Sequence, residues 1–348
     1  MTCDVSEDDM RCNRVCAVLV AVMAPILLSV ATAQTTDGSI YRVTTQLVAV
    51  DTQVLDKKSG HALLSLKEID FQIYEDKVPQ KITAFSQDEL PLSIVLLFDL
   101  TDSVRPVLKP LAKGALQALK HLKAEDEVAV MTYSASARLL QDFTTDRTMA
   151  VNAIQKASRM ESGEAAFFNE GIYQAAARLG STNPMRRRVI VWLTDDVPNF
   201  PSEEIRARYG RSLGKNKLHS EKDAAEELLR TGTVVCTLLQ LSQMSDNEFS
   251  LRRAKPSETM INTLLYPPGE VHRYAQISGG HVMDSGGNHI DEQLATLIDD
   301  IRLRYNLGYH PQGDKPKGKY CTIQVKLSPE AKKSHPAVTI EARQGYFR

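Results

Sequence analysis

Acidic and hydroxyl side chains alternate directly after an apolar run in the first third of the sequence. Asp99, Thr101 and Ser103 follow five consecutive apolar residues, at every second position. A second acid, Asp195, ends another apolar run. Carboxylate and hydroxyl oxygens are hard ligands that suit Mg²⁺, Mn²⁺ or Ca²⁺. Because the same residue types also cap helices, the pattern indicates a cation site only where the two loops meet.

The elements that must position these side chains alternate between strand and helix. Strands are predicted at residues 94–98, 127–133, 188–194, 233–241 and 281–283, with an edge strand at 137–143. Helices are predicted at residues 107–122, 148–159, 166–179, 222–230, 271–277 and 290–304. This order predicts an α/β fold with a doubly wound, mostly parallel sheet. Such sheets bind ligands beyond the carboxyl ends of their strands, where Asp99 and Asp195 would face one site.

Two segments with strand patterns flank this region. Residues 40–90 and 305–348 contain alternating polar and apolar runs, rich in Val, Thr and Tyr and separated by turn residues. We expect both segments to pack together as one small β domain, a β-sandwich. An α/β domain at residues 91–304 would then be inserted between its N-terminal and C-terminal parts.

The first 33 residues differ from the rest of the chain. Residues 15–30 are almost wholly apolar, and a small-x-small triplet ends at Ala33. This pattern is typical of a secretory signal peptide cleaved after Ala33, and it predicts a secreted, periplasmic or cell-envelope protein. An uncleaved anchor is the alternative, and only then is membrane contact expected. The acidic residues before Met10 do not suit a signal peptide, so we expect translation to begin at Met10.

The amino-acid composition is that of a globular protein with almost no net charge. The chain has 348 residues, 43% of them hydrophobic, and a formal net charge of -1 at pH 7. A charge so near zero gives no argument for nucleic-acid binding. Beyond the signal segment the only cysteines are Cys236 and Cys321, which lie in strand-like runs. They are predicted to be buried thiols rather than a disulfide framework.

Familiar catalytic motifs are absent from the sequence. None of the eight histidines has HExxH spacing, and no Gly-x-x-x-x-Gly-Lys or Gly-x-Ser-x-Gly motif occurs. An aspartate at the end of the first buried strand is also where aspartyl phosphatases of the haloacid dehalogenase type keep their nucleophile. Those enzymes need a second acid two positions later, where this chain has Thr101. We therefore expect no enzyme, with a phosphatase-like hydrolase as a distant alternative.

Other conspicuous segments have structural interpretations. Arg186–Arg188 precede a buried strand, which favours a solvated strand start over an anion site. The basic segment 206–222 is either a specificity loop over the site or a solvated helix and loop, and 243–270 is a second long connection. Phe167 and Phe168 are expected to pack the third helix. The tyrosines of the β segments are expected to be core or edge residues, namely Tyr305, Tyr309 and Tyr346.

Several short motifs together carry a resemblance to a known family. DLTDS at residues 99–103 resembles the Asp-x-Ser-x-Ser loop of von Willebrand factor A (VWA) domains, and LTDD at 193–196 resembles that family's second acidic loop. DFQIYED at 70–76, YNLGY at 305–309 and RQGYF at 343–347 are similar to the VWFA-related family of secreted bacterial proteins. The motifs occur in the order expected of that family.

The resemblance implies a Rossmann-like fold with an open divalent-metal site, the metal-ion-dependent adhesion site (MIDAS). Thr101 and Ser103 would bind the ion directly, and Asp99 and Asp195 would bind it directly or through water. An acidic group of a partner would fill the vacant position. The implied cofactor is Mg²⁺, Mn²⁺ or Ca²⁺.

One departure from the family pattern concerns the third loop of this site. The family brings a Thr from the loop before its third helix, and Ala165 falls at that position here. Alanine offers no oxygen, so Glu164 or a water is the alternative ligand. Because coordination number and ligand type control affinity, binding and loss of the metal both stay open.

The resemblance and the missing catalytic motifs imply recognition rather than catalysis. We expect an exported protein that binds a protein or another acidic macromolecular ligand through the metal site, as in cell adhesion. A metal-free VWA scaffold that binds by its surface only is the alternative within the same fold.

Overall fold

The computed structural model describes residues 47–161, 163, 166–196, 219–240, 270–285, 289–313 and 315–348. The chain divides into two compact units, residues 1–44 and 45–348, and every described residue belongs to the second. The predicted signal peptide at residues 1–33, Glu164, Ala165 and most of the two long connections lie outside the described residues. Within the described part of the chain, no helix is both long and apolar enough to span a membrane.

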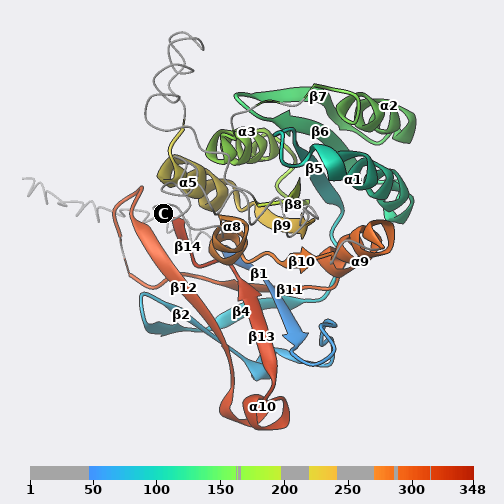
Figure 1. Cartoon of the computed structure of the whole chain (residues 1–348). Helices are drawn as coiled ribbons and strands as arrows, with labels where there is room; N and C mark the ends of the chain where they lie inside the picture. Colours follow the sequence, from blue (N-terminus) through green and yellow to red (C-terminus); the bar gives the residue numbers. More distant parts are fainter. Residues whose placement is uncertain are drawn as a thin grey trace, which may run out of the picture. The chain divides into compact units, whose positions relative to one another are not determined.

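A six-stranded sheet forms the centre of the fold, with the strand order β10-β9-β8-β5-β6-β7 (Figure 1). In chain order its strands are β5 (Leu92–Asp99), β6 (Glu127–Tyr133), β7 (Ala137–Thr144), β8 (Arg187–Thr194), β9 (Val234–Leu239) and β10 (Val282–Asp284). Neighbouring strands are parallel except β6 and β7, which are antiparallel. The predicted mostly parallel sheet, with its edge strand after residue 136, is confirmed.

Helices cover both faces of this sheet. One face packs against α1 (Arg105–Ala118), with the short η2 (Leu119–His121), α2 (Arg147–Ala157) and α9 (Ile290–Arg302). The other face packs against α3 (Phe168–Gly180), α5 (Glu221–Thr231) and α8 (Glu270–Ser278). Alternate residues of β5 enter the two cores, because successive strand side chains point to opposite faces. Ile94 and Leu96 enter the first core, and Val95 and Leu97 enter the second.

Strands from both ends of the described chain form two antiparallel sheets, ordered β13-β1-β11-β4 and β14-β12-β2-β3. The strands before the central sheet are β1 (Val48–Asp56), β2 (Phe71–Glu75), β3 (Val78–Gln80) and β4 (Ile82–Ser86). Those after it are β11 (Tyr305–Tyr309), β12 (Tyr320–Leu327), β13 (Val338–Ala342) and β14 (Gly345–Phe347). Both sheets share one apolar core. The two flanking segments therefore pack together, as their patterns predicted.

Two short helical elements in these segments have no counterpart in the sequence prediction. They are η1 (Glu68–Asp70), before β2, and α10 (Pro329–Ser334), after β12. The Ser328 side chain caps α10 by accepting a hydrogen bond from the backbone N–H of Ala331. Helices of this length carry too little periodicity to be recognised from a sequence.

Arg187, the first residue of β8, is buried where the central sheet meets β1. Its Nε donates to Asp51 Oδ2 at 2.7 Å, and Arg304 Nε donates to Asp51 Oδ1 at 2.8 Å. The predicted solvated strand start at Arg186–Arg188 is therefore wrong for Arg187. The carboxylate that neutralises it lies 136 residues earlier in the chain, too far for a local sequence pattern to reveal.

The predictions for buried cysteines and aromatic residues are confirmed. Cys236 and Cys321 are buried and free. Phe168 packs edge-to-face on Trp192 in the core beneath α3. The three tyrosines of the β segments are all buried, namely Tyr305, Tyr309 and Tyr346.

Candidate functional site

The carboxyl ends of β5 and β8 lie side by side at one edge of the central sheet. Phe98 is paired with Leu193, so Asp99 and Thr194 end the two strands together. Asp99 ends β5, and the loops that leave the two strands carry the other three residues predicted as metal ligands, Thr101, Ser103 and Asp195. This edge is where ligands bind in open α/β sheets.

Three of these residues place oxygen atoms close together. Thr101 Oγ1 lies 3.1 Å from Ser103 Oγ, and Ser103 Oγ donates to Asp195 Oδ1 at 3.3 Å. Adjacent oxygens on one octahedral Mg²⁺, with bonds of about 2.1 Å, are separated by roughly 3 Å. The two hydroxyls and the carboxylate oxygen thus have the spacing and the chemistry of ligands to one small divalent cation.

Asp99 is fully buried, and both of its oxygens accept hydrogen bonds. Oδ1 accepts from the backbone N–H of Thr101 at 2.8 Å, and Oδ2 accepts from Tyr133 Oη and Thr194 Oγ1, both at 2.7 Å. Tyr133 Oη in turn accepts from Trp192 Nε1 at 2.9 Å. Burial raises the pKa of Asp99 above its ordinary value of 3.8, while the donated hydrogen bonds oppose that rise.

Tyr133, Thr194 and Trp192 were not predicted as site residues. Tyr133 and Thr194 are the last residues of β6 and β8, the two neighbours of β5. Their position at the carboxyl ends of predicted strands was a signal that could have found them. Their contact with Asp99 makes the carboxylate a fixed anchor for the first loop.

A third loop reaches the same edge through Gly163. Its N–H donates to the carbonyl of Leu100 at 2.8 Å, and its carbonyl accepts from the N–H of Asp102 at 3.1 Å. These bonds form a parallel bridge between Gly163 and Thr101. The loop that precedes α3 therefore lies against the first loop, although its neighbouring residues Glu164 and Ala165 lie outside the described part of the chain.

The second loop contains a residue with left-handed backbone. Asp196 has φ of 52°, which is uncommon for a residue other than glycine. Its N–H donates to Thr194 Oγ1 at 3.2 Å, and the residue is 7% exposed. The backbone therefore leaves the extended conformation of β8 by Asp196, directly after Asp195.

A different acidic cluster lies in the β sheets, at Glu75, Asp76 and Cys321. The ammonium group of Lys315 lies within it, 2.5 Å from Glu75 Oε1 and 2.8 Å from Asp76 Oδ2. The hydrogen bond from Lys315 is the main reason that the pKa of Asp76 falls to about 2. Both carboxylates are thus already paired with a cation of the protein itself.

Several solved structures are similar to this chain at low sequence identity, and each match covers a different part of it. BatB from Bacteroides thetaiotaomicron is 15% identical, with 60% of this chain and 98% of that chain covered and a TM-score of 0.39. A von Willebrand factor type A protein from Catenulispora acidiphila is 11% identical, and the match covers 87% of this chain and 74% of that chain with a TM-score of 0.41. The PilB minor pilin from Streptococcus sanguinis is 15% identical, and the match covers 62% of this chain and 61% of that chain with a TM-score of 0.40. Likenesses at this level carry no inference about function.

The family comparison is more specific than the structural one. No curated protein matches the chain. The family model of the von Willebrand factor type A domain matches residues 94–197. This range begins within β5 and ends just after the second acidic loop, so it contains Asp99, Thr101, Ser103 and Asp195. The chain therefore contains a von Willebrand factor type A (VWA) domain over residues 94–197.

Proposed function

We propose that this protein recognises another protein, or another acidic macromolecule, through a divalent cation at the carboxyl edge of its central sheet. The observation that carries the proposal is the group of three oxygens from Thr101, Ser103 and Asp195, each about 3 Å from the next. Mg²⁺, Mn²⁺ and Ca²⁺ all favour such hard oxygen ligands.

The residues of the site have different tasks in this proposal. Thr101 and Ser103 offer hydroxyl oxygens to the ion, and Asp195 offers a carboxylate oxygen. Asp99 holds the first loop in place through the N–H of Thr101 and adds negative charge close to the site. The bound cation supplies a positive charge that attracts a carboxylate of the partner.

A binding role fits Asp99 better than a catalytic one. A nucleophilic carboxylate must reach its substrate, whereas Asp99 is 0% exposed and both of its oxygens accept hydrogen bonds from the protein. The residue two positions later is Thr101, which cannot serve as a carboxylic general acid. We therefore propose a non-enzymatic protein, exported by the signal segment at residues 1–33.

The test is the melting temperature of the protein with and without divalent cations. Saturating Mg²⁺ or Mn²⁺, at about a hundred-fold excess over Kd, should add about 2.7 kcal/mol of stability and raise the melting temperature by roughly 5 °C. The double variant Ser103→Ala and Asp195→Asn should lose this rise. The exposed residues Asp88 and Ser334 offer matched controls, because Asp88→Asn with Ser334→Ala should keep it.

Two outcomes would replace the proposal. If no divalent cation shifts the melting temperature, the protein is a metal-free VWA scaffold that binds by its surface. If the protein hydrolyses a phosphate ester and Asp99→Asn abolishes that turnover, it is an enzyme of the aspartyl phosphatase type.

A further inference from the structure

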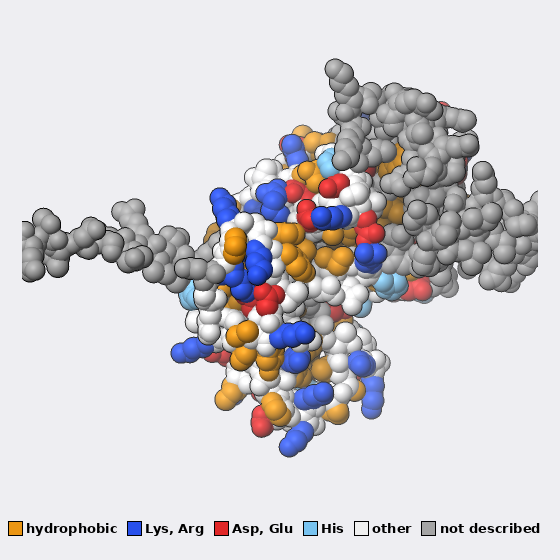
Figure 2. All heavy atoms as spheres, turned by 90° about the vertical axis from the view of Figure 1, so that its left-hand side faces the viewer, with side chains coloured by type: hydrophobic (Ala, Val, Ile, Leu, Met, Phe, Trp, Pro, Cys, Tyr) orange, Lys and Arg blue, Asp and Glu red, His pale blue; other side chains and the backbone are white. Residues whose placement is uncertain are grey.

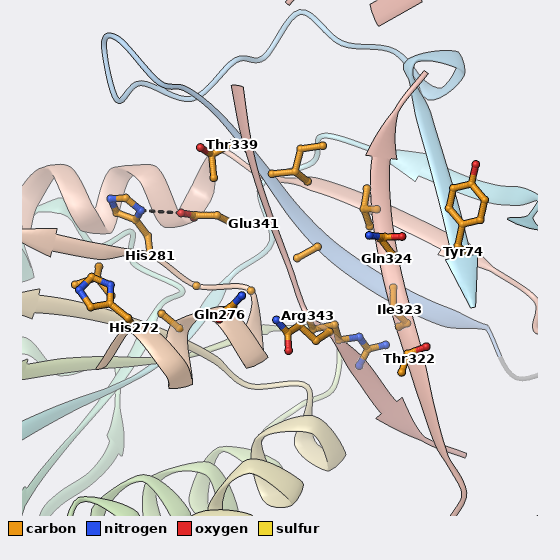
Figure 3. A pocket seen from close by; sticks show the side chains of 18 of the residues that line it. Tyr74, His272, Gln276, His281, Thr322, Ile323, Gln324, Thr339, Glu341 and Arg343 are labelled. Atoms are coloured by element: carbon orange, nitrogen blue, oxygen red, sulfur yellow. Dashed lines mark hydrogen bonds and ion pairs between the residues drawn. The ribbon is translucent and has the colours of Figure 1, made fainter. Parts of the chain in front are cut away.

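A polar groove of about 800 Å³ lies between α8, the turn that follows it, and the strands β12 and β13 (Figure 3). Its size is within the range of about 300–1,000 Å³ that ligand sites occupy. The turn at residues 279–281 leads into β10, which runs parallel to β9. The groove is therefore at the amino-terminal edge of the central sheet, opposite the edge that carries Asp99 and Asp195.

The charged side chains that line the groove are mostly basic. Among the described residues that line it, the one carboxylate is Glu341, which is paired with His281, whose Nδ1 lies 2.8 Å from Glu341 Oε1. Lys77 and Arg343 also line the groove, and among the described residues neither has an acidic partner within ion-pair distance. Figure 2 shows many basic side chains on one face of the molecule. Lys317, Lys319 and Lys326 of the C-terminal β segment are exposed. The groove thus offers positive charge to an anion.

Arg343 differs from Arg187 and Arg304, the two buried arginines at the junction with the central sheet. Arg187 and Arg304 both donate to the carboxylate of Asp51. Arg343 instead donates through Nη2 to the carbonyl of Ala49 at 2.5 Å, and its guanidinium lies 5.7 Å from the centre of the Tyr346 ring. Its buried Nε has no hydrogen-bond partner among the described residues. The guanidinium thus has no carboxylate partner among the described residues, so its charge is available to an acidic ligand.

The groove is also bordered by an unpaired strand edge. β13 is the outer strand of its sheet and pairs only with β1 among the described strands. In an antiparallel pair, every second residue directs its N–H and C=O away from the partner strand. The sequence of β13, VTIEA, contains neither Lys nor Pro, the residues that commonly protect an edge from pairing with another chain. Among the described residues, Arg304 Nη2 donates to the C=O of Glu341 at 3.4 Å, and the other outward backbone groups of Thr339 to Glu341 can pair with a strand in the groove.

We propose that this groove binds an extended acidic segment of a partner protein, which adds as a strand to the edge of β13 and pairs its carboxylates with Lys77 and Arg343. Strand addition supplies affinity through main-chain hydrogen bonds, and side-chain pockets supply selectivity. The exposed hydroxyls and amides of Thr322, Gln324 and Thr339 offer further polar contacts along the groove. This site is independent of the cation site, so the protein can hold two partners at opposite edges of one sheet.

A phage library of random linear peptides, selected on the full-length chain in the presence of a chelator, tests the proposal. The enriched sequences should be acidic. The most enriched peptide is then synthesised together with a copy in which glutamine and asparagine replace its acidic residues. The acidic peptide should bind more tightly in fluorescence polarisation, and hydrogen exchange should slow at Thr339 to Glu341.

Variants of the two basic residues separate a specific site from general attraction. Lys77→Glu should weaken binding about ten-fold or more, because like charges oppose each other at the interface. Lys333→Glu makes the same charge change at an exposed position on α10, outside the groove, and should have little effect. Arg343→Gln should also weaken binding, provided that its melting temperature shows a folded protein.

Several results would overturn the proposal. The selection would contradict it if no peptide is enriched over an unrelated bait, or if the enriched peptides lack acidic residues. The binding assay would contradict it if the Lys77→Glu and Lys333→Glu variants bind the peptide with equal affinity. Hydrogen exchange would contradict it if the peptide protects only residues outside β13 and the groove. Loss of binding in the Ser103→Ala and Asp195→Asn double variant would assign the interaction to the carboxyl edge of the central sheet instead.

Discussion

At the scale of single residues, Asp99 is the side chain that organises the candidate cation site. Its two oxygens join the N–H of the first loop to side chains at the ends of both neighbouring strands. A carboxylate buried in this way is stable only while its donors are present. Asp99 therefore has a structural task that is separate from any bound ion.

We expect Asp99→Asn to destabilise the protein even without divalent cations. An amide NH₂ replaces one acceptor oxygen, so either Tyr133 and Thr194, which both donate to Oδ2, or the Thr101 N–H, which donates to Oδ1, loses its acceptor, at a cost of about 2–3 kcal/mol. Urea unfolding in the presence of a chelator measures this loss. Asp102→Asn, an exposed change in the same loop, should stay within about 0.5 kcal/mol. Equal stability of Asp99→Asn and Asp102→Asn would show that the buried hydrogen bonds contribute little.

The sequence was sufficient to predict where the four oxygen-bearing residues lie, but not what holds them. Asp99 and Asp195 follow apolar runs, and the carboxyl ends of parallel strands share an edge. The bond from Tyr133 to Asp99 depends instead on strand order and on side-chain rotamers, which no local pattern encodes. Binding of a metal ion by the hydroxyls of Thr101 and Ser103 stays a prediction.

At the scale of elements, one buried group of charges joins the central sheet to the β sheets. Asp51 of β1 accepts hydrogen bonds from Arg187 of β8 and from Arg304, the residue before β11. Arg304 also donates to Gln53 Oε1 at 3.0 Å. Both guanidinium groups lie below 5% exposure, so each needs the carboxylate as a partner.

We expect Asp51→Asn to cost about 3–5 kcal/mol, because it leaves two buried guanidinium groups without a neutralising charge. Asp88→Asn, at an exposed position of the same N-terminal segment, should cost less than about 0.5 kcal/mol. Chemical unfolding of the two variants beside the wild type measures the difference. A loss below 1 kcal/mol for Asp51→Asn would mean that water replaces the carboxylate at this junction.

The elements of the α/β region were more predictable than the β sheets. Apolar runs and helical periods located the strands and helices between residues 91 and 304, because those signals are local. The sheets depend on pairing between β1 and β11, and between β2 and β12, across the whole central region. A single sequence indicates that these segments are strands, but not that they form two sheets with β13 at an outer edge.

At the scale of the whole described unit, the two edges of the central sheet have different surroundings. The carboxyl edge carries the candidate cation site. The amino edge packs on the β sheets, where Gly280 leaves no room for a side chain because a Cβ would lie 1.9 Å from the carbonyl oxygen of Val235. His281 follows in this turn and pairs with Glu341 of β13. The contact therefore links the central sheet to the β sheets through a group that titrates.

The His281–Glu341 pair predicts a pH-dependent contribution to stability. The hydrogen bond to Glu341 raises the pKa of His281 above its ordinary value of 6.5, and the charges of Glu341 and Asp300 raise it further. Burial and the positive charge of Arg304 lower the pKa, but by less. A histidine whose pKa is raised by folding stabilises the native state fully below the unfolded pKa, and this stabilisation is lost as the pH rises through the folded pKa. His281→Gln should thus lower the melting temperature by about 2 °C near pH 6 and by less near pH 9.

A matched histidine provides the control for this measurement. His121 pairs with Asp299 at the surface, where both side chains are more than 40% exposed. His121→Gln should change the melting temperature little at either pH, because exposed ion pairs contribute little. A His281→Gln difference that grows with pH would contradict the assigned direction of the pKa shift.

The central claim is that Thr101, Ser103 and Asp195, anchored by Asp99, hold one divalent cation. A titration with Mn²⁺, followed by the electron paramagnetic resonance of the free ion, tests it most directly. We predict that the wild type binds one Mn²⁺ per chain, that Mg²⁺ displaces it, and that the Ser103→Ala and Asp195→Asn double variant does not bind it. Wild type that leaves all Mn²⁺ free, or a double variant that binds as the wild type does, would contradict the account.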